Sequence, residues 1–136
     1  MVSVIIVDSN VFIFGEVGNA PENKAAIAKI RDVLMQGEIG INAIIVSEVF
    51  HKLQVFFGRA EAEARVSRIV SDPDVRFGQF SAETALRAMK LARDFQMRIN
   101  DAMIAQQAME TGSAVLTDNV KDFGKIKALK IIVLRG

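Results

Sequence analysis

Short apolar runs that end at polar residues mark the predicted strands. Residues 2–7 form a nearly continuous β-branched run that stops at Asp8, which is typical of a strand buried on both faces of a parallel sheet. Further strand patterns lie at 39–42, 75–80, 113–117 and 130–134.

Longer segments in which apolar residues recur every three to four positions predict helices. These segments are 22–35, 43–57, 60–70, 81–95 and 100–111, with a short helix or turn at 121–127. The stretch after Asp8, which contains Gly15, Gly18 and Pro21, is expected to be a loop. Because strands alternate with helices, we predict an α/β fold, a three-layer α/β/α sandwich with a central parallel sheet.

Composition narrows the class of protein. With 136 residues, 51% of them hydrophobic, the chain is expected to form a single domain over 1–136. It has no cysteine and one histidine, which excludes thiolate zinc sites, iron–sulfur clusters and cysteine nucleophiles. The net charge of +1 means that any contact with nucleic acid is local. The N-terminus lacks the basic region of a signal peptide and no apolar run is long enough to span a membrane, so we expect a cytoplasmic protein.

Two acidic residues directly follow predicted strands. Asp8 ends the first strand and Asp118 follows 113–117, and the carboxyl ends of parallel strands meet in one crevice, where ligands collect. The alternative is that these residues, with Asn119, form ordinary turns and helix caps.

Two further acids lie in apolar helical segments. Glu48 is flanked by Val46 and Val49, where an unpaired buried carboxylate is costly, although a pair with Lys52 is an alternative. Asp101 shares the apolar stripe of its helix and is expected to point inward, unless it only complements the helix dipole. Two carboxylates about 5 Å apart repel by roughly 3 kcal/mol at an effective dielectric near 20. An all-oxygen cluster of this kind suits Mg²⁺ or Mn²⁺.

Four segments in order along the chain carry a family resemblance: Val7–Ile13 (VDSNVFI), Ser47–Val49, Asn100–Ala105 (NDAMIA) and Val115–Phe123 (VLTDNVKDF). Together they resemble the PIN-domain ribonuclease family, in particular its VapC-type toxins. The resemblance implies a metal-dependent endoribonuclease in which carboxylates hold one or two Mg²⁺ ions and a metal-activated water attacks an RNA phosphodiester.

On this resemblance Asp8, Glu48 and Asp101 match the acidic positions of the family. The fourth position is Asp118, Asn119 or Asp122. We predict that the catalytic and metal-binding residues are Asp8, Glu48, Asp101 and Asp118, and that the supporting residues are Ser9, Asn10, Thr117, Asn119 and Asp122.

The resemblance also implies a homodimer and an antitoxin that covers the acidic groove. Basic side chains beyond Glu48, Arg98 among them, are candidates for gripping RNA, but several stand four residues from an acid and form predicted surface pairs: Glu61–Arg65, Glu83–Arg87 and Asp94–Arg98. His51 is interpreted as structural or solvated.

Several other classes of protein are alternatives to a toxin nuclease. A haloacid-dehalogenase-like phosphatase requires a second aspartate where Asn10 stands, a receiver domain requires an acidic pair and a later lysine, and no P-loop is present. A non-catalytic RNA- or protein-binding module stays open because of Asn119. A housekeeping RNA-processing nuclease is the enzymatic alternative.

Overall fold

The computed structural model describes residues 3–135, which form a five-stranded parallel sheet with helices on both faces. The strand order is β3-β2-β1-β4-β5. The strands are β1 (Ser3–Val7), β2 (Gly37–Ile41), β3 (Val75–Phe77), β4 (Ala114–Thr117) and β5 (Ile131–Val133). The predicted α/β fold with a central parallel sheet is therefore confirmed; Val2, the predicted first residue of the opening strand, lies outside the described residues.

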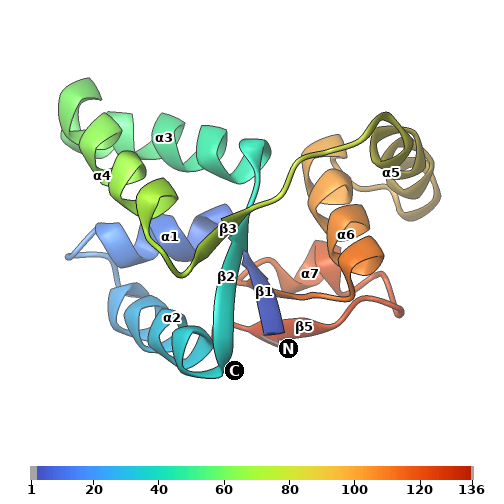
Figure 1. The fold of residues 1–136 in the computed structure, drawn as a ribbon, viewed down its shortest axis with the longest axis horizontal. Helices are drawn as coiled ribbons and strands as arrows, with labels where there is room; N and C mark the ends of the chain where they lie inside the picture. Colours follow the sequence, from blue (N-terminus) through green and yellow to red (C-terminus); the bar gives the residue numbers. More distant parts are fainter. Residues whose placement is uncertain (1–2, 136) are drawn as a thin grey trace.

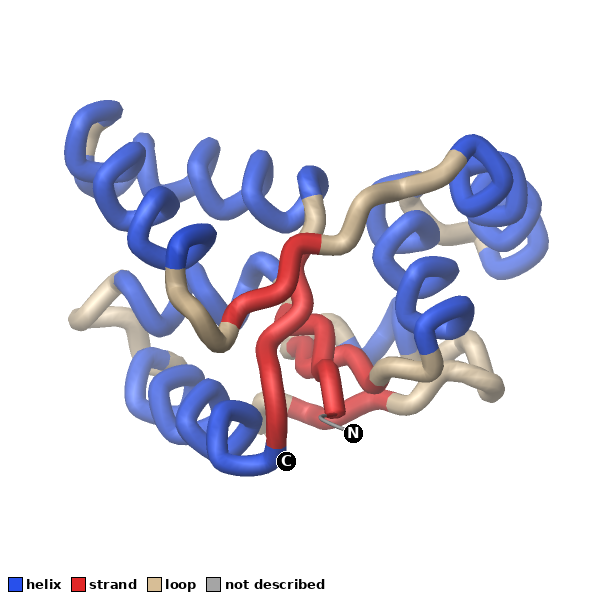
Figure 2. Tube along the Cα trace, viewed as in Figure 1, coloured by secondary structure: helices blue, strands red, loops and turns tan. Residues whose placement is uncertain are grey.

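The helices divide into two groups, one on each side of the sheet (Figure 1). They are α1 (Ser9–Glu16), α2 (Asn23–Gln36), α3 (Ala43–Phe57), α4 (Arg59–Ser71), α5 (Ala82–Phe95), α6 (Ile99–Thr111) and α7 (Val120–Phe123). Helices α1 to α4 lie on one side and α5 to α7 on the other, with the strands between them, as the colouring of Figure 2 shows.

Helix α1 corrects the expectation of a loop after Asp8. The Asp8 carboxylate accepts a hydrogen bond from the Ser9 backbone N–H at 2.9 Å and caps the helix. Val11 and Phe12 are buried against the core. The helix spans only eight residues and its four consecutive apolar residues, 11–14, mask the helical period, so the sequence pattern did not reveal it.

Strand β1 is the centre of the molecule. It pairs in parallel with β2 on one side and with β4 on the other, and Ile5, Ile6 and Val7 are buried. This double burial explains the continuous apolar run that predicts the strand. Within residues 3–135, no helix has the length and apolar character needed to cross a membrane.

Candidate active site

The sheet reverses its direction of growth between β1 and β4. From β1 the chain adds β2 and β3 on one side, and β4 and β5 lie on the other. In open α/β sheets the carboxyl ends of strands at such a switch point border a crevice. Asp8 follows β1 there, and its backbone N–H donates to the Leu116 carbonyl of β4 at 2.9 Å.

Asp8 is the most enclosed acidic side chain of this crevice, at 4% exposed. Its carboxylate accepts hydrogen bonds from the Thr117 hydroxyl at 2.7 Å, the Asn10 amide at 3.1 Å and the Ser9 backbone N–H at 2.9 Å. Burial raises the pKa of Asp8 above its ordinary value, while these hydrogen bonds oppose the shift. The site thus holds a desolvated carboxylate in one fixed orientation.

Glu48 reaches the same crevice from α3. Asn42 caps this helix by accepting the Ile45 backbone N–H at 3.0 Å. The Ser9 hydroxyl donates to Glu48 Oε1 at 3.0 Å, so Ser9 bridges the two carboxylates of Asp8 and Glu48. Among the described residues Glu48 forms its ion pair with Arg98, at 3.5 Å, and not with Lys52.

Asp101 is brought in by the first turn of α6 and is 6% exposed. Its carboxylate accepts no hydrogen bond and forms no ion pair with any residue in 3–135, unlike the other acids of the crevice. Burial, followed by the negative charge of Asp8, raises the pKa of Asp101 to about 6; Arg98 opposes this and Glu48 and Asp122 add to it. The inward orientation predicted for Asp101 is confirmed.

Asp118 and Asp122 are the two candidates for the fourth acidic residue of the site, and they have different partners in the structure. Asp118 forms a bidentate ion pair with Arg135, with N···O distances of 3.1 and 2.8 Å. Asp122 instead accepts a hydrogen bond from the Asn119 amide at 3.2 Å and is among the charges that raise the pKa of Asp101. Asp122 also pairs with Lys125 at 3.5 Å, so both candidates have a cationic partner, and what distinguishes Asp122 is that its charge acts on Asp101.

The predicted supporting residues contact these acids directly. Ser9, Asn10 and Thr117 bond to Asp8, and Asn119 bonds to Asp122. Asn10 and Thr117 also accept the backbone N–H groups of Asp118 and Asn119, at 3.2 and 2.9 Å, which fixes the loop after β4. The switch point is thus a connected polar network rather than a set of isolated turns.

Across residues 3–135, no three histidine, cysteine, aspartate or glutamate side chains lie close enough together to form a ready-made metal site. The donor set nevertheless fits a hard cation. Asp8 and Asp101 are buried carboxylates with raised pKa, and Asp101 has no partner among the described residues. Oxygen ligands of this kind are those that Mg²⁺ and Mn²⁺ prefer.

The comparisons with known proteins agree with this architecture. The family model described as PIN domain matches residues 5–129, nearly the whole chain. The chain belongs to the PIN domain family. No curated protein matches the sequence of this PIN domain significantly.

Several solved structures have a fold similar to that of this PIN domain. VapBC2 from Rickettsia felis, bound to a DNA fragment from its promoter, has a TM-score of 0.77 at 16% identity, covering 96% of this chain and 98% of that one. The sarcin–ricin loop cleaving toxin VapC20 from Mycobacterium tuberculosis has a TM-score of 0.75 at 14% identity, with coverages of 92% and 98%. FitAcB from Neisseria gonorrhoeae has a TM-score of 0.70 at 19% identity, with coverages of 96% and 97%. These likenesses establish the shared fold.

The ion-pair partner of Arg98 differs from the one that the sequence predicts. Its spacing from Asp94 predicts a surface pair, but Asp94 pairs with its neighbour Arg93 at 3.1 Å, and Arg98 turns to Glu48. Arg98 precedes α6 and lies three residues before Asp101, so it brings a cation to the edge of the acidic group. Glu48 and Arg98 are 50 positions apart in the sequence, so local spacing does not reveal this contact.

Proposed function

We propose that this PIN domain is a Mg²⁺- or Mn²⁺-dependent endoribonuclease that hydrolyses RNA phosphodiesters with a metal-activated water. The observation that carries the proposal is Asp101, a carboxylate that is 6% exposed, has a pKa raised to about 6 and finds no partner among the described residues. Burying a carboxylate without a partner is costly. A shared cation would compensate this cost for Asp101 and Asp8 together.

Asp8, Glu48 and Asp101 would hold the metal, with Asp122 as the fourth carboxylate. Asp118 is the alternative fourth ligand that the sequence favours. Each of the two has a cationic partner, Arg135 for Asp118 and Lys125 for Asp122, and the action of the Asp122 charge on Asp101 supports Asp122. A bound Mg²⁺ would polarise the phosphoryl oxygen, lower the pKa of a bound water and stabilise the leaving oxygen.

The surrounding residues position these carboxylates. Thr117, Asn10 and the Ser9 backbone each donate to Asp8, so its oxygens are fixed before any ligand arrives. Arg98 partly neutralises Glu48, and its side chain is 70% exposed, so it is free to turn toward an RNA phosphate that approaches the crevice. Arg98 is therefore our candidate for a local contact with substrate.

We further propose that the nuclease is the toxin of a toxin–antitoxin pair, acts as a homodimer in the cytoplasm and is covered by an antitoxin protein. Support comes from the similar structures, which include VapBC2 and a toxin–antitoxin complex from Klebsiella pneumoniae. Co-purification of the chain with the product of a neighbouring gene would support this pairing. Its absence would favour a housekeeping RNA-processing nuclease.

Cleavage of a mixed pool of structured RNAs tests the activity. The purified protein is incubated with Mg²⁺, with Mn²⁺ or with EDTA, beside a Glu48→Gln variant, and the cleaved ends are mapped. We expect cuts that require the metal and disappear in the variant. RNA that is bound but never cut would contradict the nuclease and favour a non-catalytic binding module.

A further inference from the structure

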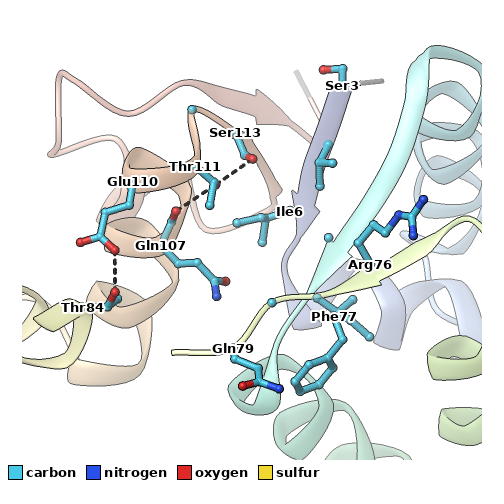
Figure 3. Close-up of a pocket in the computed structure, with 15 residues that line it drawn as sticks. Ser3, Ile6, Arg76, Phe77, Gln79, Thr84, Gln107, Glu110, Thr111 and Ser113 are labelled. Carbon is cyan, nitrogen blue, oxygen red and sulfur yellow. Dashed lines mark hydrogen bonds between the residues drawn. The ribbon is translucent and has the colours of Figure 1, made fainter. Parts of the chain in front are cut away.

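A cavity lies between the sheet and helices α5 and α6, away from the acidic group formed by Asp8, Glu48, Asp101 and Asp122. Its volume is about 520 Å³, and none of the four proposed acidic ligands lines it. Figure 3 shows its two walls: the Ile6 side chain points from β1 toward α6, and the Gln107 amide points from α6 toward the strands. A volume of this order is typical of small-molecule sites.

Gln107 of α6 is the polar group directed into this cavity (Figure 3). It is 7% exposed. Its Oε1 accepts a hydrogen bond at 2.8 Å from the amide of Asn42, which is itself fully buried. Asn42 uses its own Oδ1 to cap α3, so its amide nitrogen has to be the donor to Gln107.

This chain of bonds fixes the orientation of the Gln107 amide. With Oε1 facing Asn42, the Nε2 group and its two N–H donors face the cavity. Nε2 donates to no atom in the described part of the chain. Gly78 packs against the amide, because a Cβ at that position would lie 2.9 Å from Nε2. The cavity therefore contains an oriented hydrogen-bond donor that opens onto its interior and has no acceptor among the described residues.

The remaining walls give the cavity a neutral character. The charged side chains that line it are already compensated, because Arg76 pairs with Glu38 at 2.6 Å and Glu110 with Arg87 at 3.2 Å. Glu110 also accepts the Thr84 hydroxyl at 2.5 Å (Figure 3). Apolar lining comes from Val4, Ile6, Ile41 and Phe77.

We propose that this cavity binds a neutral, largely apolar small molecule whose carbonyl oxygen accepts hydrogen bonds from Gln107 Nε2. Amides, lactones and ketones belong to this class. An anion would gain little binding free energy in this cavity, because the guanidinium that lines it, that of Arg76, is already paired with Glu38. The site is independent of the nuclease proposal, because it shares no residue with the acidic group.

Two probes of matched shape test the donor. Acetophenone carries a carbonyl, and ethylbenzene has a methylene in its place. We expect acetophenone to shift the side-chain amide resonances of Gln107 in a ¹H–¹⁵N NMR titration, and to bind about five- to tenfold more tightly than ethylbenzene. Equal affinities for the two probes, or no shift of the Gln107 amide up to the solubility of acetophenone, would overturn the proposal.

Variants separate the donor from the shape of the cavity. Gln107→Glu keeps an oxygen acceptor for Asn42 but removes the donor, and Gln107→Met removes the donor without adding charge. Both are expected to abolish the preference for acetophenone, with folding checked by circular dichroism. Gln54→Glu, an exposed position on α3, is the matched control and should keep the preference. A preference that survives in either Gln107 variant, or is lost in the control, would contradict the proposed role of Gln107.

Discussion

Strands β1 and β4 lie side by side and each is followed directly by an aspartate, yet the two carboxylates meet opposite environments. Asp8 is 4% exposed, and burial raises its pKa. Asp118, whose side chain is 19% exposed, forms a bidentate pair with the more exposed Arg135. The same sequence pattern, a strand followed by Asp, therefore produces one desolvated carboxylate and one ordinary ion pair.

The register of the sheet explains this difference. Val7 pairs with Leu116, so Asp8 stands beside Thr117 and not beside Asp118. Thr117 donates its hydroxyl to the Asp8 carboxylate, whereas Asp118 lies beyond the end of β4 and pairs with Arg135. We therefore propose Asp122, whose charge acts on Asp101, as the fourth acid.

Of the two aspartates that follow β1 and β4, we expect the buried Asp8 to show the largest effect on RNA cleavage when its charge is removed. Asp8→Asn should lower metal-dependent RNA cleavage about a thousandfold, or ~4 kcal/mol in activation free energy, because the variant loses a proposed metal ligand without losing volume. Cleavage rates at saturating Mn²⁺ measure this loss.

The melting temperature without metal provides the control for Asp8→Asn. The variant removes a desolvated charge, which stabilises, but also one of the two oxygens that accept hydrogen bonds from Ser9, Asn10 and Thr117, which destabilises. Its melting temperature without metal should therefore stay close to that of the native chain. Cleavage within a few fold of the native rate would remove Asp8 from the site. A fall in melting temperature would show that its charge stabilises the fold instead.

The neighbour of Asp8 on β4 is expected to have a smaller effect. Thr117→Val deletes the hydroxyl that donates to Asp8 at 2.7 Å while keeping the shape of the side chain. Loss of such a supporting bond weakens metal affinity by about tenfold, so excess Mn²⁺ should restore the cleavage rate. Thr111→Val, remote from the crevice, is the matched control. A defect that excess metal does not correct would assign Thr117 a different role.

Protonation of Asp101 should be visible in the pH dependence of stability. The folded chain raises its pKa from 3.8 to about 6, so the folded state binds this proton more tightly than the unfolded state. Its contribution to the free energy of unfolding is therefore fully present below about pH 4 and is lost as the pH rises to about 6. In EDTA, the melting temperature of Asp101→Asn minus that of the native chain should increase across this window and then level off. A difference that does not change with pH would exclude a desolvated Asp101.

The smallest effect is expected at Asp118. Asp118→Asn breaks the pair with Arg135 at the surface, and we expect RNA cleavage to stay within about twofold of the native rate. The matched substitution Asp122→Asn should cause a far greater loss. If the two variants behave in the reverse way, the fourth acid is Asp118, and the contrast drawn from the sheet register does not extend to the chemistry.

Local patterns predicted most of this architecture. The run before Asp8 identifies the central strand, and the apolar stripe of α6 predicts the burial of Asp101. Helix α1 was missed because its apolar residues are consecutive. The choice between Asp118 and Asp122 depends on the pairing of β1 with β4, and the partners of Arg98 and Gln107 depend on the packing of α6 near α3. These are tertiary contacts between residues far apart in the sequence, which periodicity alone does not encode.

Binding of Mn²⁺ measured by isothermal titration calorimetry is the most direct test that the buried carboxylates share a cation. The native chain, Asp8→Asn and Asp118→Asn are titrated at one pH above 7, where Asp101 is ionised. We predict that the native chain and Asp118→Asn bind with similar affinity and that Asp8→Asn loses binding. Equal binding by all three proteins, or no binding by the native chain at millimolar Mn²⁺, would contradict a metal site at the ends of β1 and β4.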